Sequence, residues 1–90
     1  MNEAPSSMPR IARHYRLQWE PVQDCHVLLY PEGMVQLNRS AAEILMRCDG
    51  TRSVAAIVAE LETAFATNGL AGDVAHFLAH ARAQHWIEPA

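Results

Sequence analysis

The sequence contains no lysine and no long apolar run, and each absence narrows what the chain can do. Its seven cationic residues are all arginines, scattered between residues 10 and 82 among ten acids, and the formal charge is −3. A protein that binds nucleic acid usually gathers its cations on one face to neutralise phosphates, so this composition argues against such a partner. No stretch approaches the roughly 20 apolar residues that a membrane-spanning helix needs, so we also expect no membrane segment.

Cysteine is scarce as well. Cys25 and Cys48 are the only two, and they do not have the C-x-x-C spacing of a redox or zinc site. The start, MNEAPSSMPR, carries an acid and prolines where a signal peptide has basic residues and then an apolar stretch. We therefore expect a cytoplasmic protein whose thiols stay reduced. Residues 1–13 show no periodicity, which predicts a flexible N-terminal arm before a single domain over residues 14–90.

The usual signatures of catalysis are missing from the sequence. It contains no glycine-rich phosphate loop, and Glu60 and Glu62 lie two residues apart, so they cannot share a helix face. Both cysteines fall at apolar positions, where a buried thiol is inert. His76 and His80 have a spacing that can chelate a metal on a helix, but two solvated histidines explain the same pattern and no third strong ligand accompanies them. We expect no enzyme activity, no cofactor and no bound metal.

Three short segments alternate apolar and polar residues, or are apolar on both faces, as strands of a sheet are. They are YRLQWE, CHVLLY and MVQL, at residues 15–20, 25–30 and 34–37. The links between them are short, and in the second link Pro31 fixes one φ while Gly33 can take a positive φ. Successive strands with short links predict an antiparallel three-stranded sheet.

A helix follows the third strand almost without a linker. Ser40 with Glu43 fits a capping box, and Asn38 is a competing cap. Glu43 and Arg47 make a favourable pair four residues apart. Gly50 is a natural left-handed stop.

Two further helices are expected, one over about residues 52–66 and one from Asp73 to about Ile87. The predicted fold is therefore α+β, with a three-stranded antiparallel sheet followed by three helices, β-β-β-α-α-α. This arrangement is winged-helix-like, with the sheet placed before the helices.

The edge of the third strand is the best candidate for function. An edge strand exposes unpaired N–H and C=O groups, and an extended peptide can add there as a fourth strand. The residues expected to supply main-chain bonds are Met34, Val35, Gln36, Leu37 and Asn38. Such an edge can also pair with a second copy of the chain, so a homodimer would compete with peptide.

Main-chain bonds alone do not give tight binding. Each contributes about 0.5–1.5 kcal/mol net, whereas micromolar affinity needs about −8 kcal/mol, so apolar contacts must supply the rest. A groove between the third strand and the third helix would offer Phe77, Leu78 and Ala81. Periodicity does not separate this interpretation from one in which the same residues are core, and Trp19 and Trp86 are likewise either packing or binding aromatics.

Residues 28–61 resemble the pyrroloquinoline quinone (PQQ) biosynthesis protein D family, PqqD. The family pattern is an acidic turn, V-x-L-N, a small residue at the helix start, I-L and an Asp-Gly stop. It is met here by Glu32, Val35, Leu37, Asn38, Ala41, Ile44, Leu45, Asp49 and Gly50. The segment FLAHARAQHWI also looks like the ending of the family, so the resemblance covers roughly residues 14–88.

The resemblance implies a non-catalytic peptide chaperone, a precursor-peptide recognition element. Members of the family bind the leader of the precursor peptide PqqA and present it to the radical S-adenosylmethionine (SAM) enzyme PqqE, which joins a glutamate and a tyrosine of the peptide. The leader adds antiparallel to the third strand and packs on the third helix, where Arg82 and His85 would make polar contacts. The alternative is a winged-helix DNA-binding module, but its recognition helix would offer only Arg82 against Asp73 and Glu88.

Overall fold

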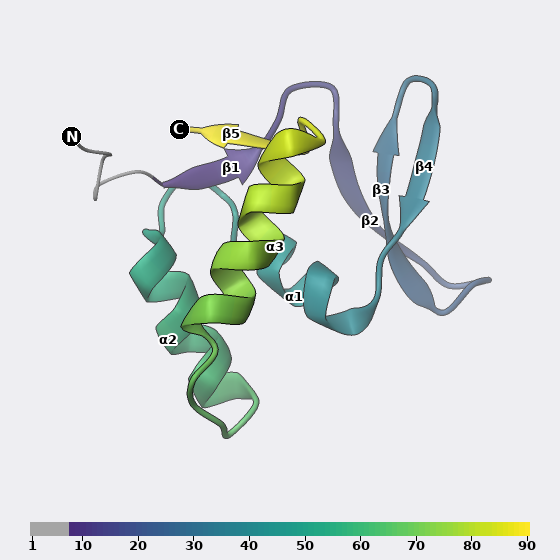
Figure 1. Ribbon diagram of the computed structural model, residues 1–90. Helices are drawn as coiled ribbons and strands as arrows, with labels where there is room; N and C mark the ends of the chain where they lie inside the picture. Colours follow the sequence, from purple (N-terminus) through teal and green to yellow (C-terminus); the bar gives the residue numbers. More distant parts are fainter. Residues whose placement is uncertain (1–7) are drawn as a thin grey trace.

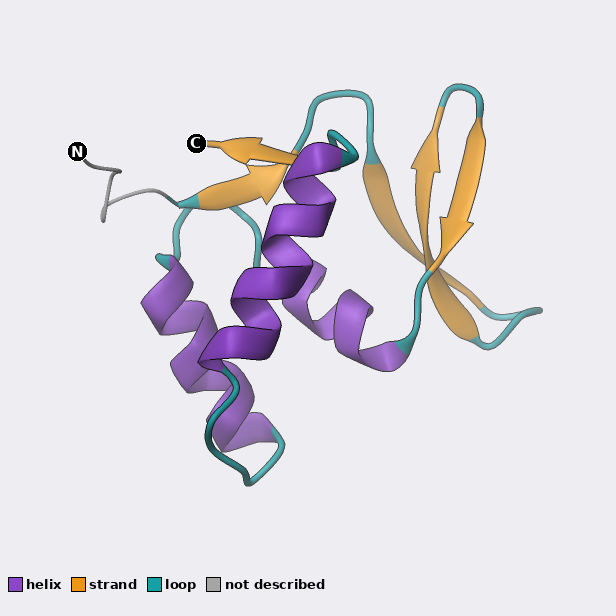
Figure 2. Cartoon of the chain, in the orientation of Figure 1, coloured by secondary structure: helices purple, strands orange, loops and turns teal. Residues whose placement is uncertain are grey.

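The computed structural model describes residues 8–90 and contains two small sheets and three helices (Figure 1). In chain order the elements are β1 (Pro9–Ile11), β2 (Arg16–Glu20), β3 (Cys25–Tyr30), β4 (Gly33–Gln36), α1 (Arg39–Met46), α2 (Val54–Ala64), α3 (Ala71–Ala83) and β5 (Ile87–Pro89). Strands β2, β3 and β4 form the antiparallel sheet that precedes the helices. The expected α+β fold is therefore confirmed, and β1 and β5 add a two-stranded ribbon on the other side of α3 (Figure 2).

The register of the three-stranded sheet sets its two faces. Leu28 of the central strand lies opposite Leu17 of β2 and opposite Val35 of β4. These three side chains form a cross-strand row on one face because residues that pair directly share a face. Leu28 is fully buried, and the row packs against the helical core. This face is called the core face below.

The hydrophobic core joins the sheet to all three helices and to β5. Helix α1 packs on β3, while α3 packs on α2 and β5. The buried residues of the cluster are Leu28, Leu37, Ala41, Ala42, Ile44, Leu45, Cys48, Ile57, Leu61, Val74, Leu78, Ala81 and Ile87. Full burial of one large aliphatic side chain contributes about 1.5–3 kcal/mol, so this cluster is the main source of stability.

The strand-to-helix junction is capped by Asn38. Its Oδ1 accepts a hydrogen bond from the Ala41 N–H at 2.8 Å, and its own backbone is extended. The capping box expected at Ser40 is wrong because Ser40 already lies in the first turn of α1, which begins at Arg39. The expected pair of Glu43 and Arg47 is confirmed at 2.8 Å.

Helices α2 and α3 both end in a left-handed residue that is not glycine. In α3, which stops at Ala83 rather than near Ile87, the His85 N–H donates to Arg82 O and the Trp86 N–H donates to Ala81 O. This pair of bonds is a Schellman motif with His85 at φ 66°. His85 therefore lies beyond the helix that was expected to include it, because the chain has already turned toward β5.

Helix α2 ends in the same way, with Ala66 at φ 52°. The Ala66 N–H donates to Thr63 O and the Thr67 N–H donates to Glu62 O. Helix α3 then begins at Ala71, two residues before the expected start at Asp73. No side chain caps it, but the Glu62 carboxylate accepts a hydrogen bond from the Leu70 N–H at 3.0 Å.

The ribbon of β1 and β5 corrects the expected boundary of the N-terminal arm. The arm was expected over residues 1–13; residues 1–7 lie outside the described residues, and Pro9–Ile11 form β1. Strand β1 pairs antiparallel with Ile87–Pro89, and Arg10 forms an ion pair with Glu88 at 2.7 Å. The ordered structure therefore includes residues well before residue 14.

Candidate functional site

The outer edge of β4 leaves backbone groups unpaired. Strand β4 pairs with β3, and no other segment within residues 8–90 pairs with its second side. The Leu37 N–H donates to His26 O at 3.0 Å, which places the backbone groups of Leu37 on the β3 side. Because successive residues of an antiparallel strand direct these groups to opposite sides, Met34 and Gln36 present theirs to the free edge. The edge thus offers two N–H donors and two C=O acceptors.

Asn38, the last of the five strand residues expected to bind, is already used by the helix. Its side chain caps α1 and its carbonyl accepts the Ala42 N–H. Val35 and Leu37 point to the core face, where Val35 is half-buried and Leu37 is buried. On the other face the Met34 side chain is 46% exposed, and Gln36 donates from Nε2 to Gln23 Oε1.

The outer edge of the ribbon is less open to pairing. The bonds from Ala12 N–H to Trp86 O and from Ala90 N–H to Met8 O fix which groups of β5 face β1. By the same alternation Ile87 and Pro89 face outward. Proline has no N–H, so this edge is blunted in the way that natural sheets use against unwanted pairing.

The expected contact residues of α3 fall into two groups. Leu78 and Ala81 are 2% and 0% exposed and belong to the core, so the unbound structure does not present them to a peptide. Phe77 is half-buried, whereas Arg82 and His85 are exposed. Phe77 of α3 and Val35 of β4 thus pack against the same core. Helix α3 does not, however, lie directly along β4.

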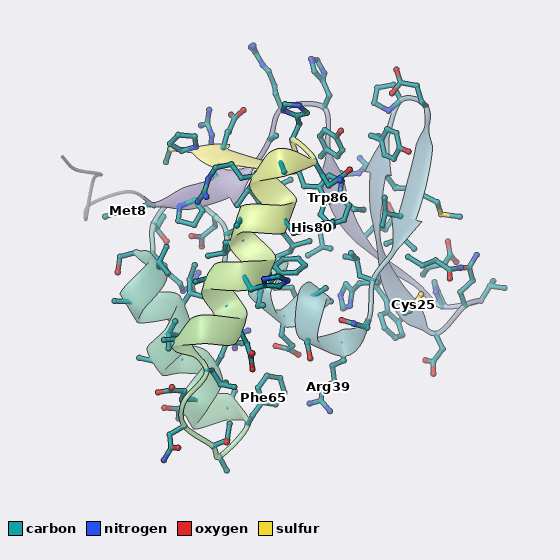
Figure 3. The ribbon with its side chains drawn as sticks, in the orientation of Figure 1. Met8, Cys25, Arg39, Phe65, His80 and Trp86 are labelled. Atoms are coloured by element: carbon teal, nitrogen blue, oxygen red, sulfur yellow. The ribbon has the colours of Figure 1, made fainter. Side chains whose placement is uncertain are left out.

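An aromatic cluster at the end of α3 was missed by the sequence analysis. The Trp86 ring lies 6.4 Å from the Phe77 ring and 5.3 Å, edge-on, from the His80 ring, measured between centroids. Figure 3 shows His80 and Trp86 close together between α3 and the sheet. Trp86 follows the helix rather than lying on it, so helical periodicity alone could not pair it with His80.

A hollow of about 290 Å³ lies where the sheet meets the start of α1. Its walls include Trp19, His26, Leu37 and Ala42, and Asp24 and Glu43 also line it. The Trp19 ring meets the His26 ring edge-on with 5.1 Å between centroids, and Trp19 is 49% exposed. The indole is therefore half open to solvent at the hollow, a feature of which alternation alone gave no sign.

Ion pairs link the end of α1 to α2. Arg47 and Arg52 both bond to the carboxylate of Glu60, at 3.2 Å and 2.8 Å. Arg52 also pairs with Asp49 at 2.6 Å. Hydrogen bonds from Thr51, and the nearby Arg52 cation, hold the pKa of Asp49 below its usual value.

The groups considered above as candidates for chemistry include the Cys48 thiol and the two histidines of α3. Burial, with the nearby Asp49 charge, raises the pKa of the Cys48 thiol to about 11, so this thiol is inert at neutral pH. His76 and His80 are exposed on α3, and nowhere in residues 8–90 do three His, Cys, Asp or Glu side chains gather as metal ligands would. Over the same residues, the longest apolar helix is too short to cross a membrane.

Comparison with known proteins identifies the family. Residues 25–87 match the family model described as coenzyme PQQ synthesis protein D (PqqD). A protein of Azotobacter vinelandii named PqqA binding protein is 56% identical over 84 residues, which is 92% of this chain and 91% of that protein. The chain belongs to the PqqD family. A protein of Pseudomonas aeruginosa with the same name is 58% identical over 83 residues, which is 91% of this chain and 90% of that protein.

A solved structure of a PqqD protein has the same fold. It is the solution NMR structure of the PqqD truncation of Methylobacterium extorquens PqqCD, described as a functional and stand-alone recognition element for ribosomally synthesised and post-translationally modified peptides. It matches with a TM-score of 0.77 and 29% identity over 94% of this chain and 93% of that chain. The PqqD family match spans the β4 edge, the hollow's α1 wall and α3, and thus every residue expected to bind.

Proposed function

We propose that this chain captures the precursor peptide PqqA by strand addition at β4 and presents it to the radical SAM enzyme PqqE. Two relatives are named for binding PqqA, and the matching solved structure is a peptide recognition element. The observation that carries the proposal is the open edge of β4, where Met34 and Gln36 direct their backbone groups away from the sheet.

The energetics require side-chain contacts beside the strand. Two N–H and two C=O groups give four main-chain bonds, worth about 2–6 kcal/mol net. Micromolar affinity needs about 8 kcal/mol, so burial of at least roughly 80–240 Å² of apolar surface must supply the remainder, and more is needed to offset the entropy cost of association. Val35, Met34 and Phe77 are partly exposed apolar residues that support such contacts.

The role we propose for the chain is positioning rather than chemistry. Tethering the leader raises the local concentration of the reacting segment at the active site of PqqE. We place this encounter in the cytoplasm, where a ribosomally made peptide is released. Arg82 and His85, exposed near the end of α3, are proposed to make polar contacts to the peptide.

The same edge can accept a second copy of the chain. Two β4 strands can pair antiparallel through Met34 and Gln36, and such a homodimer would compete with PqqA for the same backbone groups. Size-exclusion chromatography over a range of concentrations, with and without a PqqA leader peptide, checks this. Competition requires that the peptide shift any dimer to the mass of a monomer with one peptide.

Amide hydrogen exchange tests strand addition without any mutation. Uniformly ¹⁵N-labelled protein is mixed with a synthetic, unlabelled PqqA leader. The amides of Met34 and Gln36 should become at least tenfold slower to exchange, because each gains an acceptor. The matched amide is that of Leu17, which the alternation of β2 places on the opposite edge of the sheet. Protection at Leu17 instead would refute the β4 site.

A further inference from the structure

The hollow at the start of α1 lies on the core face of the three-stranded sheet. Trp19 pairs with His26, and the Leu37 N–H bonds to His26 O, so Leu37 is the residue of the β4 chain opposite His26. Trp19, His26 and Leu37 therefore form a second cross-strand row on the core face, beside the row that contains Leu28. This second row makes the sheet wall of the hollow.

A guest strand on β4 would add a fourth member to this row. A strand that pairs with Met34 and Gln36 places one residue directly opposite Leu37, with its side chain on the same face as Leu37. The two Cβ atoms would lie about 4.5–5.5 Å apart. Neighbouring strands lie about 4.8 Å apart, so a long side chain at this position can reach across Leu37 into the space beside the first turns of α1.

The walls of the hollow are suited to an aromatic side chain. Trp19 and His26 offer ring faces and edges, while Leu37 and Ala42 supply an aliphatic surface. An aromatic side chain buries about 150–250 Å². This is comparable with the apolar area that side-chain contacts must supply beyond the four main-chain bonds. A cavity of about 290 Å³ is large enough for one such ring.

The charged groups around the hollow favour a ring with a hydrogen-bond donor. The Arg39 guanidinium is turned toward the Phe65 ring, 5.3 Å from its centroid, and Glu43 pairs with Arg47. Asp24 also lines the hollow, and the ion pairs found within residues 8–90 do not involve it. A tyrosine hydroxyl or a tryptophan N–H could donate to this carboxylate.

We propose that this hollow is a specificity pocket that receives one tyrosine or tryptophan side chain of the bound peptide, from the residue opposite Leu37. The inference rests on the proposed strand addition at β4. It assigns to Trp19, on β2, a direct contact with the peptide, although β2 is not the strand to which the peptide adds.

The indole N–H signal of Trp19 tests the pocket in the unmodified protein. Trp19 and Trp86 each give one indole signal, and a Trp19→Phe spectrum assigns them. Addition of the PqqA leader should shift the Trp19 signal as strongly as the amides of Met34 and Gln36. An unmoved Trp19 signal beside protected Met34 and Gln36 amides would overturn the pocket while leaving the proposed function intact.

A double-mutant cycle identifies the guest residue. Each residue of the leader is replaced by alanine in turn, and its affinity is measured against the unmodified chain, Trp19→Ala and the control Met46→Ala. Met46 is also an exposed apolar residue, but it does not line the hollow. Replacing one tyrosine or tryptophan of the leader by alanine should raise the Kd about tenfold for the unmodified chain and for Met46→Ala. The same replacement should leave the Kd for Trp19→Ala almost unchanged.

The outcomes separate the two proposals. If every position acts additively with Trp19→Ala, the pocket is refuted. If instead Gln36→Pro binds the leader as tightly as the unmodified chain does, the proposed strand addition is refuted, and the pocket is refuted with it. Circular dichroism of Trp19→Ala checks the fold, and Trp19→Phe should retain most of the coupling because a ring remains.

Discussion

Strand β4 and the β1–β5 ribbon are both short antiparallel elements, but of these two, within residues 8–90, only β4 leaves an edge open to further pairing. In the ribbon, β1 bonds to β5 on one side and on the other to the segment that follows α1, through Ile11 N–H to Cys48 O and Gly50 N–H to Pro9 O. Its outer strand ends in Pro89, which offers no donor. Strand β4 has neither a second partner within residues 8–90 nor a proline. The difference is what we expect if the ribbon serves stability and the β4 edge serves the proposed binding of the peptide.

The largest effect is expected from a proline at the open edge. In Gln36→Pro, an outward N–H is lost and the ring occupies the place of the guest strand, so affinity for the PqqA leader should fall at least a hundredfold. Isothermal titration calorimetry measures this, and circular dichroism should show an intact fold because edge strands tolerate proline. Gln36→Ala, which keeps the N–H, should bind within about threefold of the unmodified chain; equal loss in both variants would contradict the backbone mechanism.

Truncation of a buried side chain in the ribbon should lower the stability of the chain without changing its affinity for the peptide. Ile87 is buried in the core, so Ile87→Ala should lower the free energy of unfolding by about 2–5 kcal/mol. Urea denaturation measures the loss. Peptide affinity, taken at a temperature where the variant is folded, should not change; a large change in Kd would show that the ribbon and the edge are coupled.

The cap at the strand-to-helix junction should have an intermediate effect. Asn38→Ala removes the acceptor for the Ala41 N–H and should destabilise the chain by about 1 kcal/mol. Ser40→Ala is the matched control, because Ser40 is an exposed residue within the first turn of α1. Thermal melts of the two variants compare them, and a larger loss in Ser40→Ala would contradict the observed cap.

The left-handed helix ends offer a small gain in stability. Ala66→Gly should raise the free energy of unfolding by about 0.5–1 kcal/mol, because a Cβ is strained at φ 52° and glycine is not. His85→Gly should do the same in α3. Urea denaturation measures both gains, and only His85→Gly should affect peptide binding, since His85 is a proposed contact and Ala66 is not.

The smallest effect is expected at the ion pair of the ribbon. Arg10 is exposed and Glu88 half-buried, with side chains 53% and 34% accessible, and pairs this open to solvent contribute about 0–1 kcal/mol. Glu88→Gln should therefore cost at most about 0.5 kcal/mol in urea denaturation, less at high salt. A loss above 2 kcal/mol would mean that this pair, rather than Ile87, holds the ribbon.

The sequence predicted the parts of the fold that rest on local pattern. The strands at Leu17, Leu28 and Val35 follow from alternation and short links, and α1 follows from its capping residues and the spacing of Glu43 and Arg47. The ribbon could not be found in this way because its strands have three residues each, contain prolines that resemble breaks, and pair across 78 positions between Arg10 and Glu88. Non-local pairing of this kind leaves no period in the sequence.

The helix ends and the site were predicted unevenly for related reasons. The end of α2 was expected within two residues of its observed position, whereas His85 occupies a position where glycine is usual and did not mark the end of α3. For the site, the edge at Met34 and Gln36 follows from sheet order alone. The hollow instead depends on how α1 crosses the end of the sheet, which brings Trp19 near Ala42.

The ribbon also determines how the molecule would respond to force. Met8 and Ala90 lie at the same end of the ladder, joined by the bond from Ala90 N–H to Met8 O. Tension applied between these two residues would load the cross-strand bonds one after another, as in opening a zip, rather than all at once in shear. The ribbon would thus open at low force. The β4 edge lies at the opposite side of the molecule (Figure 1), so it would keep its shape when Met8 and Ala90 are pulled apart.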